Sequence, residues 1–406
     1  MKNSIIFLIT EFLVRGIPFL LLPLYITLLS QSEFGKFSLY ISLLPLLSIL
    51  YDLSQRISIK RFYFDYPLQI KSFILYIWLF VLISFVINVL IIHFFSIQIV
   101  DDSSNFIILI VIMLYALIEQ FLTYLQISKQ AITYNIIYLI RNAIPYLAFL
   151  FLLYIATTKS YVDLIYSQML IFILIVLYIA KVLLNANTIA LMIRNLKKYL
   201  TYSLSIAIPV LPVVASAYIL SVSDRYMIKY FYSFNEVAIY SLAYNIVMIV
   251  QLFVMAIGKV WQPFIFENLK NKNFNKIKEY AIYYILSVFI ISLLIWLLDK
   301  YLVLFLANNT YLDALKLIPI LLVGIFFFFL YAMLSNVVFF YKKMFLFGLP
   351  AMISAVVNVI LNYLLLPKYG YQIAALTTTV SYFIEFVIIA IIILYLNKQI
   401  QQGIIK

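Results

Sequence analysis

The chain has few of the residues on which covalent and metal chemistry depends. Its 406 residues include no cysteine and one histidine, His93. Without cysteine there can be no disulfide and no thiolate ligand, and one histidine cannot build the paired-histidine sites of metalloenzymes. The sequence therefore predicts no metal site, and we expect no cofactor.

Charged residues are scarce as well. Only 11% of the residues are charged, whereas 67% are hydrophobic, and the mean hydropathy is +1.12. A soluble protein of this length could not bury so much apolar surface. Many apolar runs exceed the roughly 20 residues that cross a hydrocarbon core as a helix. The sequence therefore predicts an all-α integral membrane protein with many spans.

A nucleotide-binding loop is also missing. The chain has two Gly-Lys dipeptides, Gly35-Lys36 and Gly258-Lys259. Neither is followed by Ser or Thr, and neither has the glycine five residues earlier that a phosphate-binding loop requires, because Ser30 and Phe253 stand there. The segments between apolar runs are too short to hold a catalytic domain. We therefore expect a carrier rather than an enzyme.

Apolar runs bounded by charged or turn residues predict twelve transmembrane helices. The first six are expected at 4–29, 37–57, 72–97, 105–127, 131–156 and 161–184, and the second six at 201–222, 236–263, 279–298, 312–341, 344–366 and 371–396. Lysine and arginine gather in alternate loops and near both termini, which places both termini in the cytoplasm. The net charge of +13 is therefore a signal of topology and of contact with anionic lipid, not of nucleic-acid binding.

The chain also repeats itself. Residues 32–43 align without gaps on residues 235–246, and a proline pair precedes each copy, Pro18/Pro23 and Pro209/Pro212. The repeat predicts two six-helix lobes related by a pseudo-two-fold axis along the membrane normal, which is a common plan of transporters. We expect the lobes at 1–190 and 201–406, with a cytoplasmic linker at 191–200.

Ionisable side chains within the predicted spans need a reason, because each costs roughly 2.5–3.5 kcal/mol near the bilayer centre. Glu11 and Arg15 are four residues apart and share a helix face, so they either neutralise each other or form an anion or proton site in a wet cavity.

Arg141 has no acidic neighbour at helical spacing, which favours a substrate contact over an ion pair between helices. Glu385 is alone in the last span and is either a proton relay or half of a salt bridge. Ion or proton coupling is assigned to Glu11, Asp52, Glu119 and Glu385.

A polar stripe follows one face of the span predicted at 236–263. Its members recur within a narrow arc at 100° per residue, which is typical of a face that points into a bundle or cavity. They are Tyr240, Tyr244, Gln251, Gly258 and Gln262. Lys259 near the cytoplasmic end either extends toward the interface or lines a site. Pro263 is expected to end this helix.

Four segments resemble a known family. They are 25-YITLLSQSEFGKFSLY-40, 224-DRYMIKYFYSFNEVAIYSLAYN-245, 260-VWQPFIFE-267 and 358-NVILNYLLLPKYGYQIAALTTTVSY-382. In order and spacing the chain resembles the polysaccharide-type flippases, the Wzx-like exporters of O-antigen and capsule units, in the multidrug/oligosaccharidyl-lipid/polysaccharide exporter superfamily. Where many relatives have Gly-Ala-Ala, this chain has Ile373-Ala374-Ala375, so close helix packing is less assured there.

The resemblance implies a carrier that works by alternating access. It would move an undecaprenyl-diphosphate-linked oligosaccharide unit from the cytoplasmic to the outer face of a bacterial inner membrane. The implied partners are this glycolipid, the phospholipid membrane and polysaccharide polymerase machinery, with no nucleic acid. The candidate substrate contacts are Arg15, Arg141, Asp224, Arg225, Tyr240, Tyr244, Gln251 and Lys259.

Asp224 and Arg225 follow the span predicted at 201–222 and lie among tyrosine and phenylalanine rings. Our hypothesis is a switchable outer gate, with the tyrosines contacting sugars. The alternative is an aromatic belt with a surface ion pair.

Two other functions fit parts of the pattern. A drug/cation antiporter of the same superfamily would have a cavity dominated by acids and would tolerate loss of Arg141. A membrane polysaccharide polymerase or glycosyltransferase would need a large outer loop, and the sequence has none.

Overall fold

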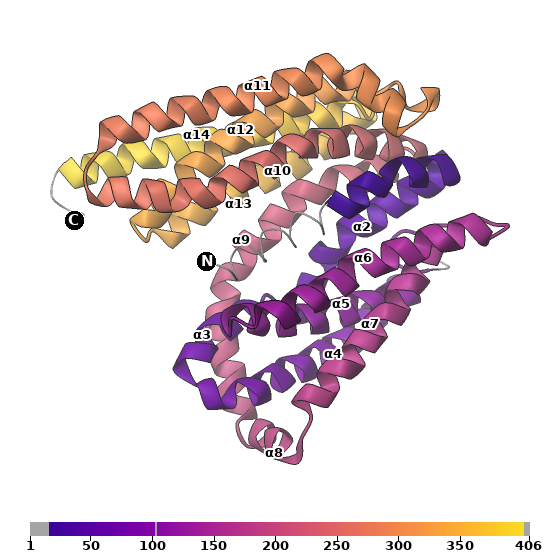
Figure 1. Ribbon diagram of the computed structural model, residues 1–406, viewed down its shortest axis with the longest axis vertical. Helices are drawn as coiled ribbons and strands as arrows, with labels where there is room; N and C mark the ends of the chain where they lie inside the picture. Colours follow the sequence, from indigo (N-terminus) through magenta and orange to yellow (C-terminus); the bar gives the residue numbers. More distant parts are fainter. Residues whose placement is uncertain (1–15, 102–103, 402–406) are drawn as a thin grey trace. The chain divides into compact units, whose positions relative to one another are not determined.

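The computed structural model describes residues 16–101 and 104–401, and this part of the chain is helical and contains no strand (Figure 1). Eleven of its helices are long and apolar enough to cross a membrane, and Gly16–Leu28 forms a shorter apolar helix. Helices suit such a chain because each satisfies its own backbone hydrogen bonds in lipid. The predicted all-α class with many spans is confirmed.

The first part of the chain contains five helices of 22–25 residues and two short ones of 9 and 10 residues. The helices are α2 (Gln31–Asp52), α3 (Arg56–Asp65), α4 (Ile70–Phe94), α5 (Asn105–Ile127), α6 (Ala131–Ile155), α7 (Val162–Leu183) and α8 (Ala186–Arg194). The short helices α3 and α8 occupy segments that the sequence analysis assigned wholly or largely to loops. They lie outside the spans because they are too short to cross a bilayer.

The second part contains longer helices. They are α9 (Leu196–Phe231), α10 (Phe234–Lys270), α11 (Phe274–Leu306), α12 (Ala314–Phe340), α13 (Met344–Tyr369) and α14 (Ile373–Gln401). The helix predicted at 201–222 continues to Phe231, and the one predicted at 236–263 continues to Lys270. Pro209, Pro212 and Pro263 lie inside these helices rather than at their ends.

The expectation that Pro263 ends its helix is wrong, for a reason visible in the packing. Trp261 and Ile265, on either side of it, are both buried. The Trp261 indole donates to the carbonyl of Met333 at 3.3 Å, and its ring lies 5.5 Å from that of Tyr284. A proline removes one backbone hydrogen bond, and the buried contacts on both sides offset that loss.

The chain divides into two compact units, Met1–Ala215 and Ser216–Lys406, and the division lies inside α9. In the first unit α5 packs against α2, α3, α4, α6 and α7. In the second unit α12 packs against α10, α11, α13 and α14. The segment 191–200, expected as a linker, is helical on both sides of Asn195. The lobe boundaries at 190 and 201 stay predictions.

The sequence repeat marks two equivalent helix starts. Ser30 is the N-cap of α2 and accepts a hydrogen bond from the backbone N–H of Glu33 at 3.2 Å. Ser233 is the N-cap of α10, and Glu236 accepts from its backbone N–H at 3.0 Å. A side chain that satisfies the free N–H groups of a first turn fixes where a helix begins. The same serine and glutamate therefore start corresponding helices in the two units.

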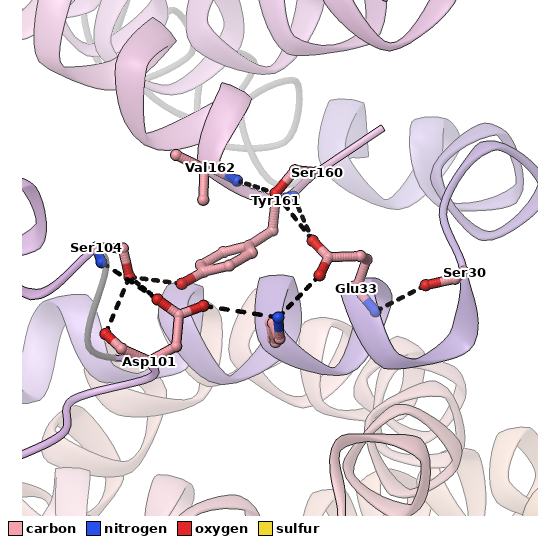
Figure 2. Close-up of polar contacts among 8 residues, drawn as sticks. Ser30, Glu33, Asp101, Ser104, Ser160, Tyr161 and Val162 are labelled. Carbon is pink, nitrogen blue, oxygen red and sulfur yellow. Dashed lines mark hydrogen bonds and ion pairs between the residues drawn. The ribbon is translucent and has the colours of Figure 1, made fainter. Parts of the chain in front are cut away.

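Glu33 also ties the start of α2 to the segments before α5 and α7 (Figure 2). Its carboxylate accepts a hydrogen bond from the backbone N–H of Tyr161 at 2.9 Å. The ammonium group of Lys36 lies 2.9 Å from the same carboxylate and 3.6 Å from that of Asp101, so it bridges the two acids. Ser104 donates to Asp101 at 2.6 Å and lies 2.6 Å from the Tyr161 hydroxyl. Burial raises the pKa of the Tyr161 phenol, so it stays protonated and able to donate. This network fixes one end of the first unit.

Gly324 allows α12 and α14 to approach closely. A Cβ at this position would lie 2.8 Å from Oγ1 and 3.2 Å from Cα of Thr379. Ala374 and Ala375 are also fully buried, so small residues support tight packing of α14.

Gly324→Ala is expected to lower the free energy of unfolding by about 1–3 kcal/mol, because the backbone of α14 must shift to admit the methyl group. Thermal unfolding of the detergent-purified protein measures this effect. Gly258→Ala is the matched control, since a Cβ there meets nothing within 4 Å. Equal melting temperatures for the two variants would contradict the close approach.

Candidate functional site

The first unit holds a cluster of four charged residues, Asp52, Arg56, Glu119 and Arg141, here called the charged cluster. Arg141 on α6 forms a hydrogen-bonded ion pair with Glu119 on α5. The other carboxylate oxygen of Glu119 lies 3.6 Å from the guanidinium of Arg56 on α3. The partner of Arg141 is thus an acid on another helix, which is the alternative that the sequence analysis placed second.

Aromatic rings complete the surroundings of Arg141. Its guanidinium carbon lies 4.8 Å from the ring centre of Tyr115 and 5.4 Å from that of Tyr138. A guanidinium over an aromatic face is stabilised by the ring quadrupole, and more so when water is excluded. Arg141 is 4% exposed. The rings and Glu119 together hold this cation in a fixed position inside the unit.

Asp52 joins the charged cluster from the end of α2. Leu53 and Ser54 have left-handed backbone conformations that end this helix, and the backbone N–H of Ser54 donates to Asp52 at 2.8 Å. Gln120, next to Glu119 on α5, donates its amide to the second Asp52 oxygen at 3.4 Å. The helix end therefore directs Asp52 toward α5, and the cluster contains two formal negative and two formal positive charges.

Several buried polar atoms in and beside the charged cluster have no hydrogen-bond partner among the described residues. They are Oγ of Ser54, Nε2 of Gln55, Oε1 of Gln120 and Nε of Arg141. Buried polar groups in folded proteins are nearly always paired, so such a concentration marks a place where water or a ligand completes the bonding. The charged cluster and its surroundings therefore contain donors and acceptors that could bind water or a ligand.

The second unit holds a polar cluster centred on Asp224 of α9, here called the Asp224 cluster. Asp224 is 2% exposed. Its carboxylate accepts hydrogen bonds from Tyr240 of α10 at 2.7 Å, Asn362 of α13 at 2.6 Å and Thr378 of α14 at 2.5 Å. One carboxylate thus joins four helices.

Neutral side chains that the sequence analysis did not single out extend the Asp224 cluster. Asn358 accepts from Ser223 at 2.7 Å and from Asn362 at 3.1 Å, and Thr377 donates to Asn362. The signal for them was present in the sequence. Two asparagines four residues apart share one face of an apolar helix, and three consecutive threonines are rare in a span.

Arg225 is buried beside Asp224 and has other partners. Its guanidinium donates to Ser241 at 3.2 Å and to the carbonyl of Ser221 at 3.0 Å, and it lies 4.5 Å from the ring centre of Tyr244. A surface ion pair of Asp224 and Arg225 is therefore wrong. The sequence analysis placed both residues after the end of a span, whereas α9 continues to Phe231 and includes them. Both side chains are therefore buried in the second unit. The outer-gate hypothesis stays a prediction that these contacts do not support.

The polar residues predicted along one face of α10 have different surroundings at its two ends. Tyr240 and Tyr244 are buried with ring centres 6.3 Å apart, and Tyr240 binds Asp224. Further along, the side-chain oxygen of Gln251 is buried without a partner among the described residues, whereas Lys259 is exposed. The structure therefore brings the two tyrosines into the Asp224 cluster and leaves Lys259 outside it.

Glu385 on α14 is 2% exposed, and its Oε2 has no hydrogen-bond partner within residues 16–101 and 104–401. Two tyrosines of the described chain, Tyr331 and Tyr382, lie close enough to interact with it electrostatically. No lysine or arginine of the described chain forms an ion pair with it, so the salt bridge, one of the two alternatives for this residue, is not found there. Glu11 and Arg15 lie outside the described residues.

The part of the chain that the structure describes has no group of three or more His, Cys, Asp or Glu side chains placed to hold a metal ion. The Asp224 cluster instead gathers carboxylate, amide and hydroxyl oxygens, the ligand type that hard cations use. In the structure these oxygens are bonded to one another's donors. A bound cation would have to replace those bonds.

Comparisons with known proteins place this fold and these clusters in context. The family "Polysaccharide biosynthesis protein" matches residues 1–269, and the family MatE matches residues 209–364. The Lsg locus protein 1 of Haemophilus influenzae is 21% identical over 369 residues, which cover 88% of this chain and 89% of that protein.

Two solved structures share the fold. One is the lipid II flippase MurJ in an inward closed conformation, with a TM-score of 0.72 and 16% identity over 96% of this chain and 87% of that one. The other is an inward-facing multidrug resistance MATE family transporter of the MOP superfamily, with a TM-score of 0.68 and 13% identity over 93% of this chain and 96% of that one. They confirm the predicted class of two six-helix lobes. Since its family matches well over half of the sequence, the chain belongs to the polysaccharide biosynthesis protein family.

Proposed function

We propose that the protein is a flippase for a lipid-linked oligosaccharide, moving an undecaprenyl-diphosphate-linked O-antigen or capsule unit outward across a bacterial inner membrane. Membership of a polysaccharide biosynthesis family and the fold shared with a lipid II flippase support this proposal. Both termini would face the cytoplasm. Polysaccharide polymerase machinery would use the product on the outer face.

The observation that carries the proposal is Arg141, a guanidinium buried in a spanning helix with its Nε free of a partner among the described residues. A diphosphate bearing sugars cannot cross lipid unaided, because its charge is costly there. Guanidinium groups bind phosphate oxygens two at a time, and Arg56 supplies a second one on the far side of Glu119. The charged cluster therefore has the chemistry of a diphosphate site.

The membrane potential can supply the energy for such a carrier. An inside-negative potential drives anions outward with about 2.3 kcal/mol per charge per 100 mV. Two net charges crossing the whole field would gain about 4–5 kcal/mol at that potential. The carrier needs no nucleotide, in agreement with the missing phosphate-binding loop, and we propose that it catalyses no chemical reaction.

A cation-coupled multidrug antiporter is the second candidate, favoured by the likeness to a MATE transporter and by the buried acids Asp224 and Glu385. The two functions differ in what deletion of the gene should do. A flippase mutant loses surface polysaccharide and accumulates complete lipid-linked units on the inner leaflet. Unchanged polysaccharide with new sensitivity to cationic drugs would establish the antiporter and refute the flippase.

Glu385 is the carboxyl group through which we propose that a proton is coupled to transport, because it is buried without a basic partner among the described residues. Glu385→Gln is expected to abolish the dependence of flipping on an imposed pH gradient while leaving the amount of protein unchanged. Proteoliposomes loaded with lipid-linked oligosaccharide from the host measure this dependence. Glu279→Gln, at an exposed position of α11, is the control. A full response to the gradient in Glu385→Gln would exclude this role.

A further inference from the structure

We infer that Glu119 occupies the anion position of a two-arginine site and is displaced when an anionic diphosphate headgroup binds. This inference rests on the proposed function and adds to it an internal competitor for the substrate. The geometry that points to it is a single carboxylate shared by guanidinium groups from two different helices. Its Oε1 is bonded to Arg141 of α6, and its Oε2 lies 3.6 Å from Arg56 of α3.

The arrangement is one that a phosphate group can copy. A carboxylate and a phosphate both present two or more negatively charged oxygens, and guanidinium groups bind either by the same charge-assisted hydrogen bonds. A diphosphate carries more charge and more acceptor oxygens than the carboxylate that it would replace. Glu119 therefore holds the two arginines in the positions that such a headgroup needs.

The two arginines of the site differ in how closely they are bound to Glu119 and in how far they are buried. The Arg141 side chain is 4% exposed and lies between the carboxylate and two tyrosine rings. The side chains of Arg56 and Glu119 are 18% and 20% exposed, and their separation of 3.6 Å is too long for a hydrogen bond. An incoming anion can thus reach the Arg56 side first, where the existing contact is weakest.

The present bonding is also incomplete. Nε of Arg141 is a buried donor without a partner among the described residues. An unpaired buried donor is unfavourable, and Glu119 does not satisfy this one although it binds the same guanidinium. A ligand with more acceptor oxygens than a carboxylate can do so. The donor that Glu119 leaves unused favours the exchange.

The net charge of the charged cluster explains why the Glu119 carboxylate has to move away from the two arginines when an anion binds. With Asp52 and Glu119 ionised, the charged cluster has no net formal charge, so an added anion would make it negative. Withdrawal of Glu119 from the arginines restores attraction for the headgroup. Replacement of this carboxylate by the amide of glutamine gives the cluster a net positive charge with little change in shape.

Binding of inorganic pyrophosphate to the purified full chain in lipid nanodiscs, measured by calorimetry, tests the inference. We expect Glu119→Gln to bind about tenfold more tightly than the unchanged protein, because a competing charged group is removed. The double variant Glu119→Gln/Arg141→Gln should lose this gain. Glu279→Gln serves as the control for a removed carboxylate elsewhere, and thermal unfolding verifies that each variant is folded.

A folded Glu119→Gln protein that binds pyrophosphate no more tightly than the unchanged protein would overturn the inference, as would the absence of binding to both. Either result would leave the flippase proposal standing if deletion of the gene still traps lipid-linked units. A long-chain isoprenyl diphosphate in the same assay identifies the source of the headgroup. Tighter binding than that of pyrophosphate supports a lipid ligand, and equal binding supports anion exchange with a soluble diphosphate.

Discussion

Replacing Arg141 by alanine is expected to abolish export of surface polysaccharide in cells that depend on this protein. The change removes the buried guanidinium and leaves Glu119 with a weaker partner, Arg56, at 3.6 Å. Breaking a buried ion pair in this way costs about 3–5 kcal/mol of stability. Arg141→Lys keeps the charge without the planar fork, so it should retain part of the export. Complementation of a deletion strain measures both variants.

A second variant separates the loss of stability from the loss of function. Arg141→Ala/Glu119→Gln removes both members of the pair and leaves the charged cluster, with Asp52 and Arg56, without net formal charge, so the melting temperature should recover toward that of the unchanged protein. Export should stay absent, because the diphosphate site has lost an arginine. Full export by Arg141→Ala at a normal protein level would contradict the site assignment and favour the antiporter.

Asp224→Asn is expected to reduce strongly the amount of folded protein in the membrane. Three donors from three helices converge on this carboxylate, and hydrogen bonds to charged groups are worth about 1.5–3 kcal/mol each. The asparagine side chain offers one acceptor oxygen and turns an amide N–H₂ group toward existing donors. Thermal unfolding in detergent should therefore show a large fall in melting temperature.

The matched control for Asp224→Asn is Asp313→Asn. Asp313 pairs with Lys316 at 2.7 Å, and both side chains are about half exposed or more, at 49% and 64%. An exposed ion pair contributes only about 0–1 kcal/mol, so this variant should unfold close to the unchanged protein. If Asp224→Asn were as stable as the control, the Asp224 cluster would not be a structural centre of the second unit.

The spans could be predicted from the sequence because a membrane helix bonds its own backbone and shows itself as a long apolar run. The residues at which the helices end could not be predicted, because packing contacts rather than hydropathy determine them. The last turns of α9 carry Asp224 and Arg225, which a scan for apolar residues excludes, yet tertiary hydrogen bonds hold both inside the fold. The continuation of α10 past Pro263 depends in the same way on contacts of Trp261 with other helices.

Individual site residues were easier to find than their partners. A charge in a span stands out by its cost, so Asp52, Glu119, Arg141 and Glu385 could be selected from the sequence. The pairing of Glu119 with Arg141 could not, since the residues lie 22 positions apart on separate helices. Asn362 and Thr378 were missed because neutral polar side chains give a weaker signal than charges do.

The measurement that tests the central claim most directly is outward transfer by the purified protein. Lipid-linked oligosaccharide from the host would be reconstituted with the protein in sealed vesicles, and the fraction reachable by an impermeant sugar-modifying enzyme would be followed with time. We predict rapid transfer with the unchanged protein, faster under a membrane potential that drives anions, and none above protein-free vesicles with Arg141→Ala/Glu119→Gln. No transfer by the unchanged protein, together with proton-driven uptake of a cationic drug, would contradict the account.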